Sequence, residues 1–295
     1  MTHPCTLADT LPLEDEAGDV VAKARSGLGL SHPTLAAELG VPVQALQAWE
    51  ALAEAIPGNL APILAERLDL KADALARLLA GNPGPGSLEE PADGWETCRF
   101  TLAPRDGAYS SNTWIVSHPE RLEAWVIDPG YRPEVPLAWL RARGLTLKGI
   151  LVTHGHRDHS GGAPWLAEQT GAPAWLHPAD HELTAEGEDF AWQDPRRWQE
   201  RAPFVTWSPG HTPGGCVWHV GIRTFVGDTM FASSIGRTFG GPANHSAHRD
   251  SVSRILGRGT DELILPGHGP ASTVGREREC NPFSRWRDDS VRSWP

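Results

Sequence analysis

The chain has 295 residues, of which 40% are hydrophobic, enough for one large domain and a smaller one with their own cores. No apolar run approaches the roughly 18 residues that a membrane-spanning helix needs, so we expect no membrane association. A formal net charge of −11 argues against a surface built to bind nucleic acid or anionic lipid. The acidic N-terminus has no apolar signal segment, which predicts a cytoplasmic protein.

The four cysteines, Cys5, Cys98, Cys216 and Cys280, indicate no disulfide framework. They show no CxxC spacing and are few for so long a chain, so we expect reduced thiols. Cys216 opens an apolar run, and we interpret it as a buried structural thiol rather than a nucleophile.

In chain order, composition divides the sequence into four segments. Residues 1–18 are acidic, and we expect a disordered tail. Residues 19–80 are rich in Ala and Leu and contain several helix-capping signals, which predict about five short helices. Residues 81–94 collect Gly, Pro and acidic residues and predict a linker. Residues 95–295 alternate short apolar runs with turns, which predicts a sheet-rich α/β domain. The strands are expected at 113–116, 125–128, 150–153, 204–207, 217–220, 225–228 and 263–265.

The strongest chemical signal follows the strand expected at 150–153. It is the run Thr153-His154-Gly155-His156-Arg157-Asp158-His159, which holds four possible metal ligands. On an extended chain, residues two apart project to the same side, so His154 and His156 can chelate one ion. The chain then turns into a helix suggested at 160–169, and Asp158 and His159 point elsewhere. This spacing suits two adjacent ions.

Three further candidates, His211, Asp228 and His268, each lie in a glycine-containing loop at or just past an expected strand end. Such loops are where α/β proteins assemble their sites. Imidazole and carboxylate groups together are the ligand set of zinc or iron. We therefore predict a metal centre rather than a set of unrelated turn residues.

Over residues 95–283 this pattern resembles the metallo-β-lactamase-fold hydrolases, whose HxHxDH motif, later His, bridging Asp and final His are all matched. The resemblance implies an αββα sandwich, here with a small all-α N-terminal domain, and metals at one edge of the two sheets. It implies a first metal on His154, His156 and His211, a second on Asp158, His159 and His268, and Asp228 as the bridge. Asp128, in an Asp-Pro-Gly turn, matches a residue that orients the metal loop from behind.

Within that group, the runs Ser234-Ile-Gly-Arg-Thr238 and Asn281-Pro-Phe283 look like the short glyoxalase II-type hydrolases, which are hydroxyacylglutathione hydrolases that cleave thioesters. This implies two divalent ions, zinc first and iron or manganese as alternatives, and attack by a bridging hydroxide. Asp158 and Asp228 would be the catalytic carboxylates, and Arg157 and Arg237 could attract an anionic substrate.

Two departures concern the thiol carrier. Phe239 follows Gly-Arg-Thr where an Asp is usual, and the chain ends 27 residues after His268, before the helical domain with which longer glyoxalase II enzymes hold glutathione. We expect a small 2-hydroxyacyl thioester as substrate, either S-lactoylglutathione or an analogue on another low-molecular-weight thiol.

Two alternative activities of the same fold remain open. A persulfide dioxygenase would bind one iron through His154, His211 and Asp228, with the other positions present but not coordinating. A lactonase would use the same hydrolytic chemistry as the thioester hydrolase.

A third alternative is a ligand-sensing DNA-binding regulator, because residues 30–50 resemble the helix-turn-helix of the Cro and phage-repressor class. Residues 1–90 contain five Lys or Arg against thirteen Asp or Glu, and counterion release at phosphates needs cations. We therefore expect no useful DNA binding. The helical segment is expected to pack on the hydrolase domain or to form a homo-oligomer, and its removal is expected to leave the metal site intact.

Overall fold

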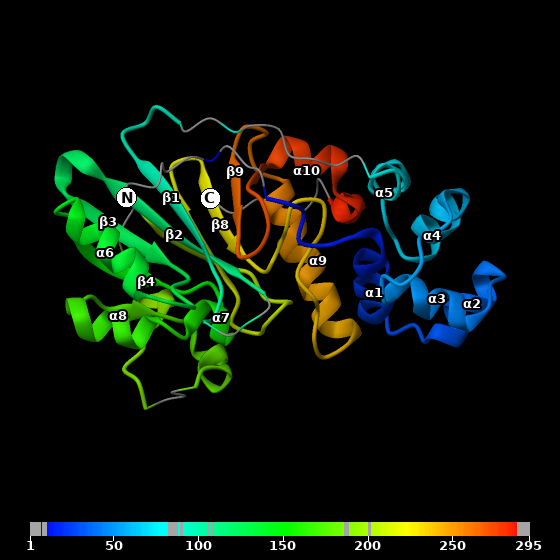
Figure 1. Cartoon of the computed structure of the whole chain (residues 1–295), viewed down its shortest axis with the longest axis horizontal. Helices are drawn as coiled ribbons and strands as arrows, with labels where there is room; N and C mark the ends of the chain where they lie inside the picture. The colour runs from blue at the N-terminus through cyan, green and yellow to red at the C-terminus, as the bar shows by residue number, and fades with distance from the viewer. Residues whose placement is uncertain are drawn as a thin grey trace.

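The computed structural model describes residues 7, 11–81, 88, 91–105, 107, 109–185, 189–199 and 202–287. Two five-stranded sheets face each other, with helices on their outer faces and a group of N-terminal helices at one end of the molecule (Figure 1). This is an αββα sandwich with an all-α N-terminal region. The predicted fold class is confirmed.

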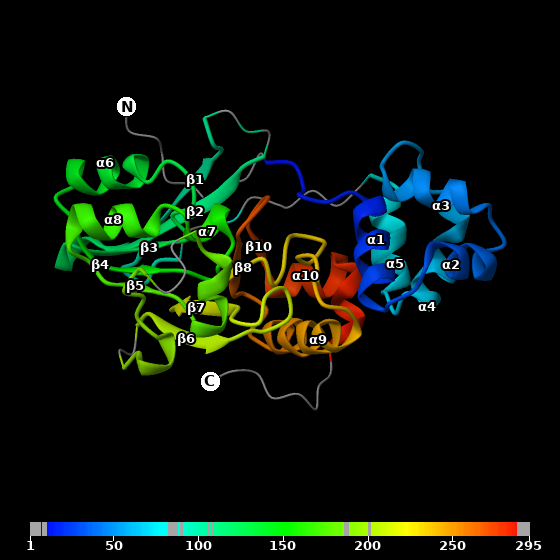
Figure 2. The same cartoon turned by 90° about the horizontal axis from the view of Figure 1, so that it is seen from below.

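The first sheet has the strand order β1-β2-β3-β4-β5. The pairs β1–β2 and β2–β3 are antiparallel, and β3–β4 and β4–β5 are parallel. Helices α6 and α8 cover its outer face (Figure 2). The elements of this half are β1 (Glu96–Leu102), β2 (Ser111–His118), β3 (Glu123–Ile127), α6 (Glu134–Ala142), β4 (Thr146–Leu151), α7 (Arg157–Ser160), α8 (Ala163–Thr170) and β5 (Ala174–Trp175).

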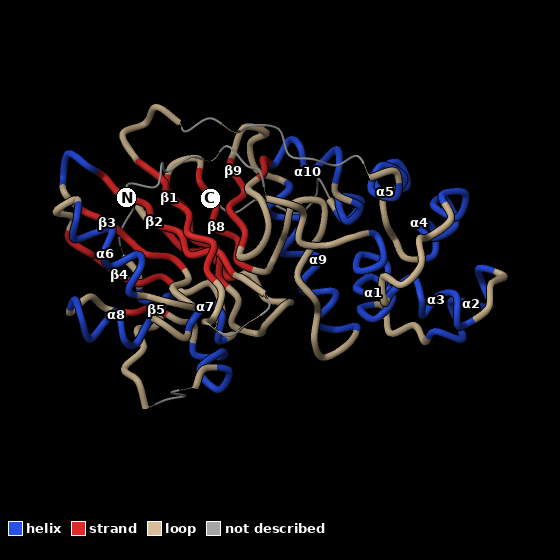
Figure 3. The backbone as a smooth tube through the Cα atoms, in the orientation of Figure 1, coloured by secondary structure: helices blue, strands red, loops and turns tan. Residues whose placement is uncertain are grey.

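The second sheet has the order β10-β9-β8-β7-β6, in which only β8–β9 is a parallel pair among the described strands. Its elements are β6 (Phe204–Trp207), β7 (Cys216–Val220), β8 (Arg223–Gly227), α9 (Pro242–Leu256), β9 (Leu263–Pro266), β10 (Ser272–Thr273) and α10 (Val274–Cys280). Each of the seven runs expected as strands overlaps one of the strands in Figure 3. The outer strand β1 and the two-residue strands β5 and β10 were not expected from the sequence.

Buried side chains on the two faces of the first sheet belong to two different core clusters. On β2, Trp114 and Val116 lie between the sheets in one buried cluster with Phe225. Ile115, the residue between them, belongs to the cluster that includes Leu140 of α6. Successive side chains of a strand point to opposite faces, so β2 contributes to both layers.

The N-terminal helices are α1 (Ala17–Gly27), α2 (His32–Leu39), α3 (Val43–Glu50), α4 (Ala61–Arg67) and α5 (Ala72–Leu79), here called the N-terminal module. Ser31 caps α2 by accepting a hydrogen bond from Thr34 N at 3.2 Å, and Gly40 ends that helix at φ +68°. The order of α2, turn and α3 agrees with the helix-turn-helix resemblance, but membership of that DNA-binding class stays a prediction.

The module shares a core with the second sheet. Val20 of α1 and Leu75 of α5 lie in the same buried cluster as Val252 of α9 and Ile264 of β9. Lys71, just before α5, adds polar contacts: its backbone N–H donates to Pro282 O at 2.6 Å and its Nζ to Arg278 O at 2.8 Å. The module therefore packs on the two-sheet domain of its own chain. The linker predicted at 81–94 lies mostly outside the described residues, as does much of the predicted tail.

The expectation of a disordered tail over residues 1–18 is wrong for the part that the structure describes. Leu7 is buried in the core between the sheets, and α1 already begins at Ala17. Asp15 is buried and forms an ion pair with Lys23 of α1, whose Nζ also donates to Ile235 O at 2.7 Å. An acidic composition does not predict disorder where one acid has a buried cationic partner.

The expectation of reduced thiols is wrong for Cys98, which is disulfide-bonded. Cys216 and Cys280 are free, and Cys216 is buried as expected. Among the described residues, no helix is both long and apolar enough to cross a lipid bilayer.

The buried Lys23–Asp15 pair gives a prediction for stability. Lys23→Met leaves Asp15 buried without its cation, so the free energy of unfolding should fall by about 3 kcal/mol in a denaturant titration. Adding Asp15→Asn to Lys23→Met should restore much of that loss.

Lys148→Met is the matched control, because the Lys148–Glu123 pair is solvent-exposed, with the two side chains 44% and 31% exposed, and should contribute less than about 1 kcal/mol. The stabilising role of Lys23 would be refuted if Lys23→Met cost no more than Lys148→Met.

Candidate metal centre

The candidate ligands converge on one edge of the two sheets. His154, His156, Asp158 and His159 follow β4, Asp228 follows β8, and His268 follows β9. Strand β4 is parallel to β3, and β9 is parallel to β8, so within each pair the carboxyl ends lie at the same edge of the sheet. His211 lies in the loop between β6 and β7. The predicted ligands are close together because the loops that carry them lie at this shared edge.

One set consists of His154, His156 and His211, whose ligand atoms all lie within 4.8 Å of one another. His211 Nε2 is 3.0 Å from His156 Nδ1, so two imidazole nitrogens face each other closely. His154 is buried, and its Nε2 has no hydrogen-bond partner among the described residues. The nitrogens point into one shared space.

The other set consists of Asp158, His159 and His268, again within 4.8 Å. His159 Nε2 lies 3.2 Å from His268 Nε2, and His268 Nε2 lies 3.3 Å from Asp158 Oδ2. His159 is fully buried, whereas Asp158 is partly accessible. This set combines nitrogen and oxygen donors, unlike the first.

Asp228 stands between the two sets. Its Oδ1 is 3.3 Å from His159 Nε2, and its Oδ2 is 3.5 Å from His211 Nε2 and 3.6 Å from His268 Nε2. Within the described residues, Asp228 Oδ1 is buried without a hydrogen-bond partner. A carboxylate that lies within 3.6 Å of nitrogens from both sets has the position that a bridging ligand requires.

The donor set fits divalent cations. A buried imidazole nitrogen and a buried carboxylate oxygen without partners are costly in the absence of a ligand, and here both point into the same cluster. Imidazole and carboxylate are the ligands that zinc and iron take in proteins. The seven predicted ligand positions are therefore suitable for two ions.

Protonation differs between the two sets. Burial lowers the pKa of His154 and His156 and lowers that of His211 to about 4, so these rings are neutral and can offer lone pairs. Burial also opposes charge on His268, but the Asp228 and Asp158 carboxylates outweigh it and raise its pKa to about 9. His268 is therefore protonated in the absence of metal, and a cation that binds to the second set must displace this proton.

Asp128 contacts the loop that follows β4 and carries His154 to His159, as the resemblance implies. Its carboxylate accepts hydrogen bonds from Thr153 N and Thr153 Oγ1, both at 2.7 Å, and lies 3.0 Å from His159 Nδ1. The two outer rings are oriented by backbone carbonyls: His211 Nδ1 is 2.6 Å from Arg237 O, and His268 Nδ1 is 2.8 Å from Ser110 O. These contacts turn the opposite ring nitrogens toward the centre.

Arg157 and Arg237, the candidate substrate-binding residues, are both exposed beside the centre. Arg237 contacts the site through its backbone carbonyl. Phe239 lies over the first set, with its ring centroid 5.9 Å from that of His156 and 5.7 Å from that of His211. It is 51% exposed, so an apolar surface borders the metal centre.

Sequence reasoning missed Asp180, which joins the two loops of the first set. Its buried carboxylate accepts hydrogen bonds from Gly155 N at 3.0 Å, Thr212 Oγ1 at 2.7 Å and Gly214 N at 2.6 Å. One loop carries His154 and His156, and the other carries His211. Asp180 lies in the 3₁₀ helix η3 (Pro178–Leu183), where no spacing to the ligands marks it. Its role is visible only in three dimensions.

The protein is thus an αββα protein with a histidine–aspartate site suited to metal ions at one edge of its sheets. Residues 106–268 match the Metallo-beta-lactamase superfamily, and the chain belongs to that family. Members of this superfamily are mostly metal-dependent hydrolases, and the fold implies divalent metal ions.

Two proteins are similar to this chain in sequence. A hydroxyacylglutathione hydrolase of Haemophilus influenzae is 31% identical over 199 residues, which are 60% of this chain and 93% of that protein. An uncharacterized protein of Mycobacterium leprae is 31% identical over 207 residues, again 60% of this chain and 94% of the relative.

Solved structures agree on the fold. The B3 metallo-beta-lactamase BLEG-1 is 27% identical with a TM-score of 0.55, and the protein TTHA1623, in a di-iron-bound form, is 30% identical with a TM-score of 0.52; each match covers 63% of this chain and 98% of the other. ETHE1 from Myxococcus xanthus, at 23% identity and a TM-score of 0.53 over 64% of this chain and 87% of that one, supports the fold alone.

The Asp180 contacts predict a selective loss of metal. Asp180→Asn keeps the shape but places an amide N–H against N–H donors, so the two loops of the first set should loosen. We expect one of two zinc ions to bind about tenfold more weakly, as measured by competition with a chromophoric chelator.

Asp250→Asn, an exposed change on α9, serves as the control and should leave both affinities unchanged. Equal zinc affinities in Asp180→Asn and Asp250→Asn would show that Asp180 does not support the ligands.

Proposed function

We propose that this protein is a dinuclear metal-dependent hydrolase that cleaves a small thioester. The observation that supports this most is the placement of Asp228 between two complete sets of ligands. Two divalent cations at these positions would supply Lewis acidity for a carbonyl oxygen and a water of lowered pKa. Zinc is the first candidate, with iron or manganese as alternatives, because the ligand set suits all three.

The residues of the chain have distinct roles in this proposal. The neutral rings of His154, His156 and His211 bind through lone pairs, while Asp228 faces both sets. Burial raises the pKa of Asp158, but the neighbouring His159 and His268 outweigh this and hold that pKa well below its usual range, so the carboxylate is ionised. Being partly accessible, Asp158 can accept a hydrogen bond from the attacking water and direct its lone pair to the carbonyl carbon.

The choice of a thioester follows from the named relatives. Hydroxyacylglutathione hydrolase is the name of several proteins about 30% identical to this chain. Arg157 and Arg237 are proposed to attract an anionic substrate, and the exposed Phe239 ring would lie against its acyl part. The persulfide dioxygenase, which would bind one iron through His154, His211 and Asp228, is the second candidate. We propose the cytoplasm as the location.

We infer further that the N-terminal module does not bind DNA. Arg25 pairs with Glu50 at 2.6 Å, Lys23 pairs with Asp15, and Lys71 donates to the hydrolase domain. Helix α3, which would read the bases in a helix-turn-helix, carries no basic residue. A duplex would therefore find few cations available to its phosphates. A homo-oligomer through this module remains part of the proposal.

The activity is tested by presenting the protein with S-lactoylglutathione and with a 2-hydroxyacyl thioester of a smaller thiol, and by measuring release of the free thiol. We expect measurable turnover of both thioesters. Removal of metal by a chelator should abolish turnover, and added zinc should restore it.

Lactones and a persulfide with oxygen are the comparison substrates. Turnover of lactones without any thioester cleavage would reassign the protein as a lactonase. Oxygen consumption with a persulfide, again without thioester cleavage, would establish the dioxygenase instead.

A further inference from the structure

A segment of the N-terminal region reaches the metal centre. Residues 11–16, here called the arm, cross the loop that follows β9. A Cβ atom at Gly269, where φ is +69°, would lie 3.1 Å from Glu14 N and 3.3 Å from Glu14 Cβ, so the arm touches the residue next to the ligand His268. Glu14 Oε1 lies 4.0 Å from His268 Nδ1.

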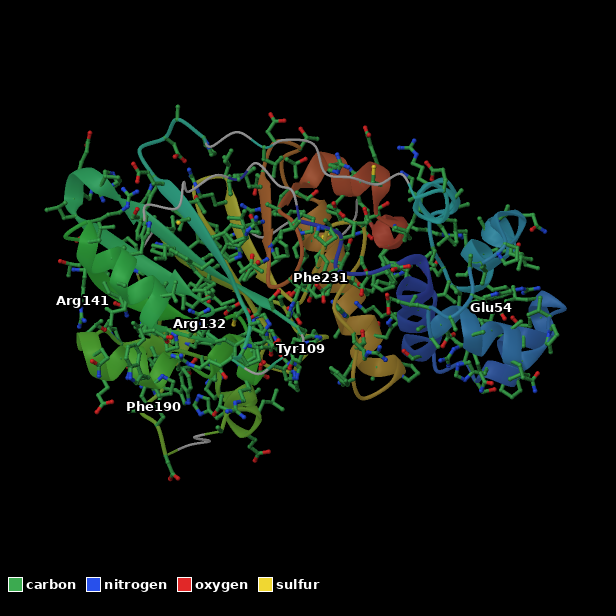
Figure 4. All side chains as sticks on the ribbon, viewed as in Figure 1. Glu54, Tyr109, Arg132, Arg141, Phe190 and Phe231 are labelled. Carbon is green, nitrogen blue, oxygen red and sulfur yellow. The ribbon has the colours of Figure 1, made fainter. Side chains whose placement is uncertain are left out.

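The N-terminal module holds the arm in this place. Asp15, adjacent to Glu14, pairs with Lys23 of α1, and Lys23 also donates to Ile235 O at 2.7 Å. Lys23 Nζ is 4.9 Å from the centroid of the Phe231 ring, which lies 5.6 Å from that of His268. Figure 4 shows Phe231 between the sheets and the module. The contacts that fix the arm therefore involve the loop after Asp228.

Glu14 has no cation of its own. Among the described residues, its only ion-pair contact within 4.0 Å is the one with His268, although its side chain is only 38% exposed. A partly desolvated carboxylate without a lysine or arginine gains little for folding. This placement is more easily explained by an effect on His268.

The neighbouring ligand also has a carboxylate beside its Nδ1, but at hydrogen-bond distance: Asp128 lies 3.0 Å from His159 Nδ1. At His268, the Nδ1 donates to Ser110 O at 2.8 Å, and the Glu14 carboxylate lies 4.0 Å from the same nitrogen. Ser110 O therefore orients the His268 ring, and the negative charge of Glu14 makes the ring a better ligand for a cation. Asp128 belongs to the hydrolase domain, whereas Glu14 comes from the arm.

We propose that Glu14 is a positioning residue of the metal centre and that the N-terminal module is a working part of the hydrolase. By holding the Glu14 carboxylate beside His268, the module strengthens binding of the second metal ion. This inference rests on the proposed dinuclear centre. It replaces the expectation that the metal site is independent of the helical segment.

The test uses the full chain with Glu14→Gln, Glu14→Asp and, as a matched control, Glu54→Gln. Glu54 is exposed in the module, and Figure 4 shows it well away from Phe231, whose ring lies 5.6 Å from that of His268. Each metal-free protein is titrated with zinc against a chromophoric chelator. Glu14→Gln should weaken the second ion about tenfold and leave the first unchanged. Glu14→Asp, which keeps the charge, should recover part of the loss.

Two results would overturn the inference, and they differ. If Glu14→Gln binds the second zinc as tightly as Glu54→Gln does, Glu14 has no positioning role, while the dinuclear centre stands. If the wild-type chain binds only one ion, the dinuclear centre and the role of Glu14 fail together. Equal denaturant midpoints of the two Gln variants show that any weakening does not come from unfolding.

Discussion

The structure depends on one electrostatic constraint at the edge of the sheets. Three carboxylates and five histidines that the structure brings together there are largely buried, and two of their polar atoms have no hydrogen-bond partner. Such a group is stable only when positive charge lies among the donors. In the protein alone, raised pKa values let His159 and His268 supply part of that charge. Divalent cations supply it more effectively, which connects the fold to metal chemistry.

Much of the remaining structure keeps these donors in place. Asp128 fixes the loop after β4 to the turn after β3, and Asp180 ties that loop to the one carrying His211. The shared core then joins the N-terminal module to the back of the second sheet, so the arm can reach His268. The loops thus hold the ligands in place, and the N-terminal module holds the arm beside one of them.

The sequence was sufficient for the features that are local in the chain. Short apolar runs alternating with turns identified seven strands, and the HxHxDH string placed four donors beside one of them. The sequence was insufficient where a contact joins distant segments. Asp180 lies 25 residues from the Gly155 amide that it binds, and Glu14 is separated from His268 by most of the chain.

The central claim is that two metal ions bind around Asp228 and that both are needed for hydrolysis. The most direct test is metal analysis of the full chain purified without chelators, with thioester turnover measured on the same samples as zinc is restored to the metal-free protein. The account predicts two ions per chain and full turnover only when the second is bound. Full activity with a single ion per chain would contradict it.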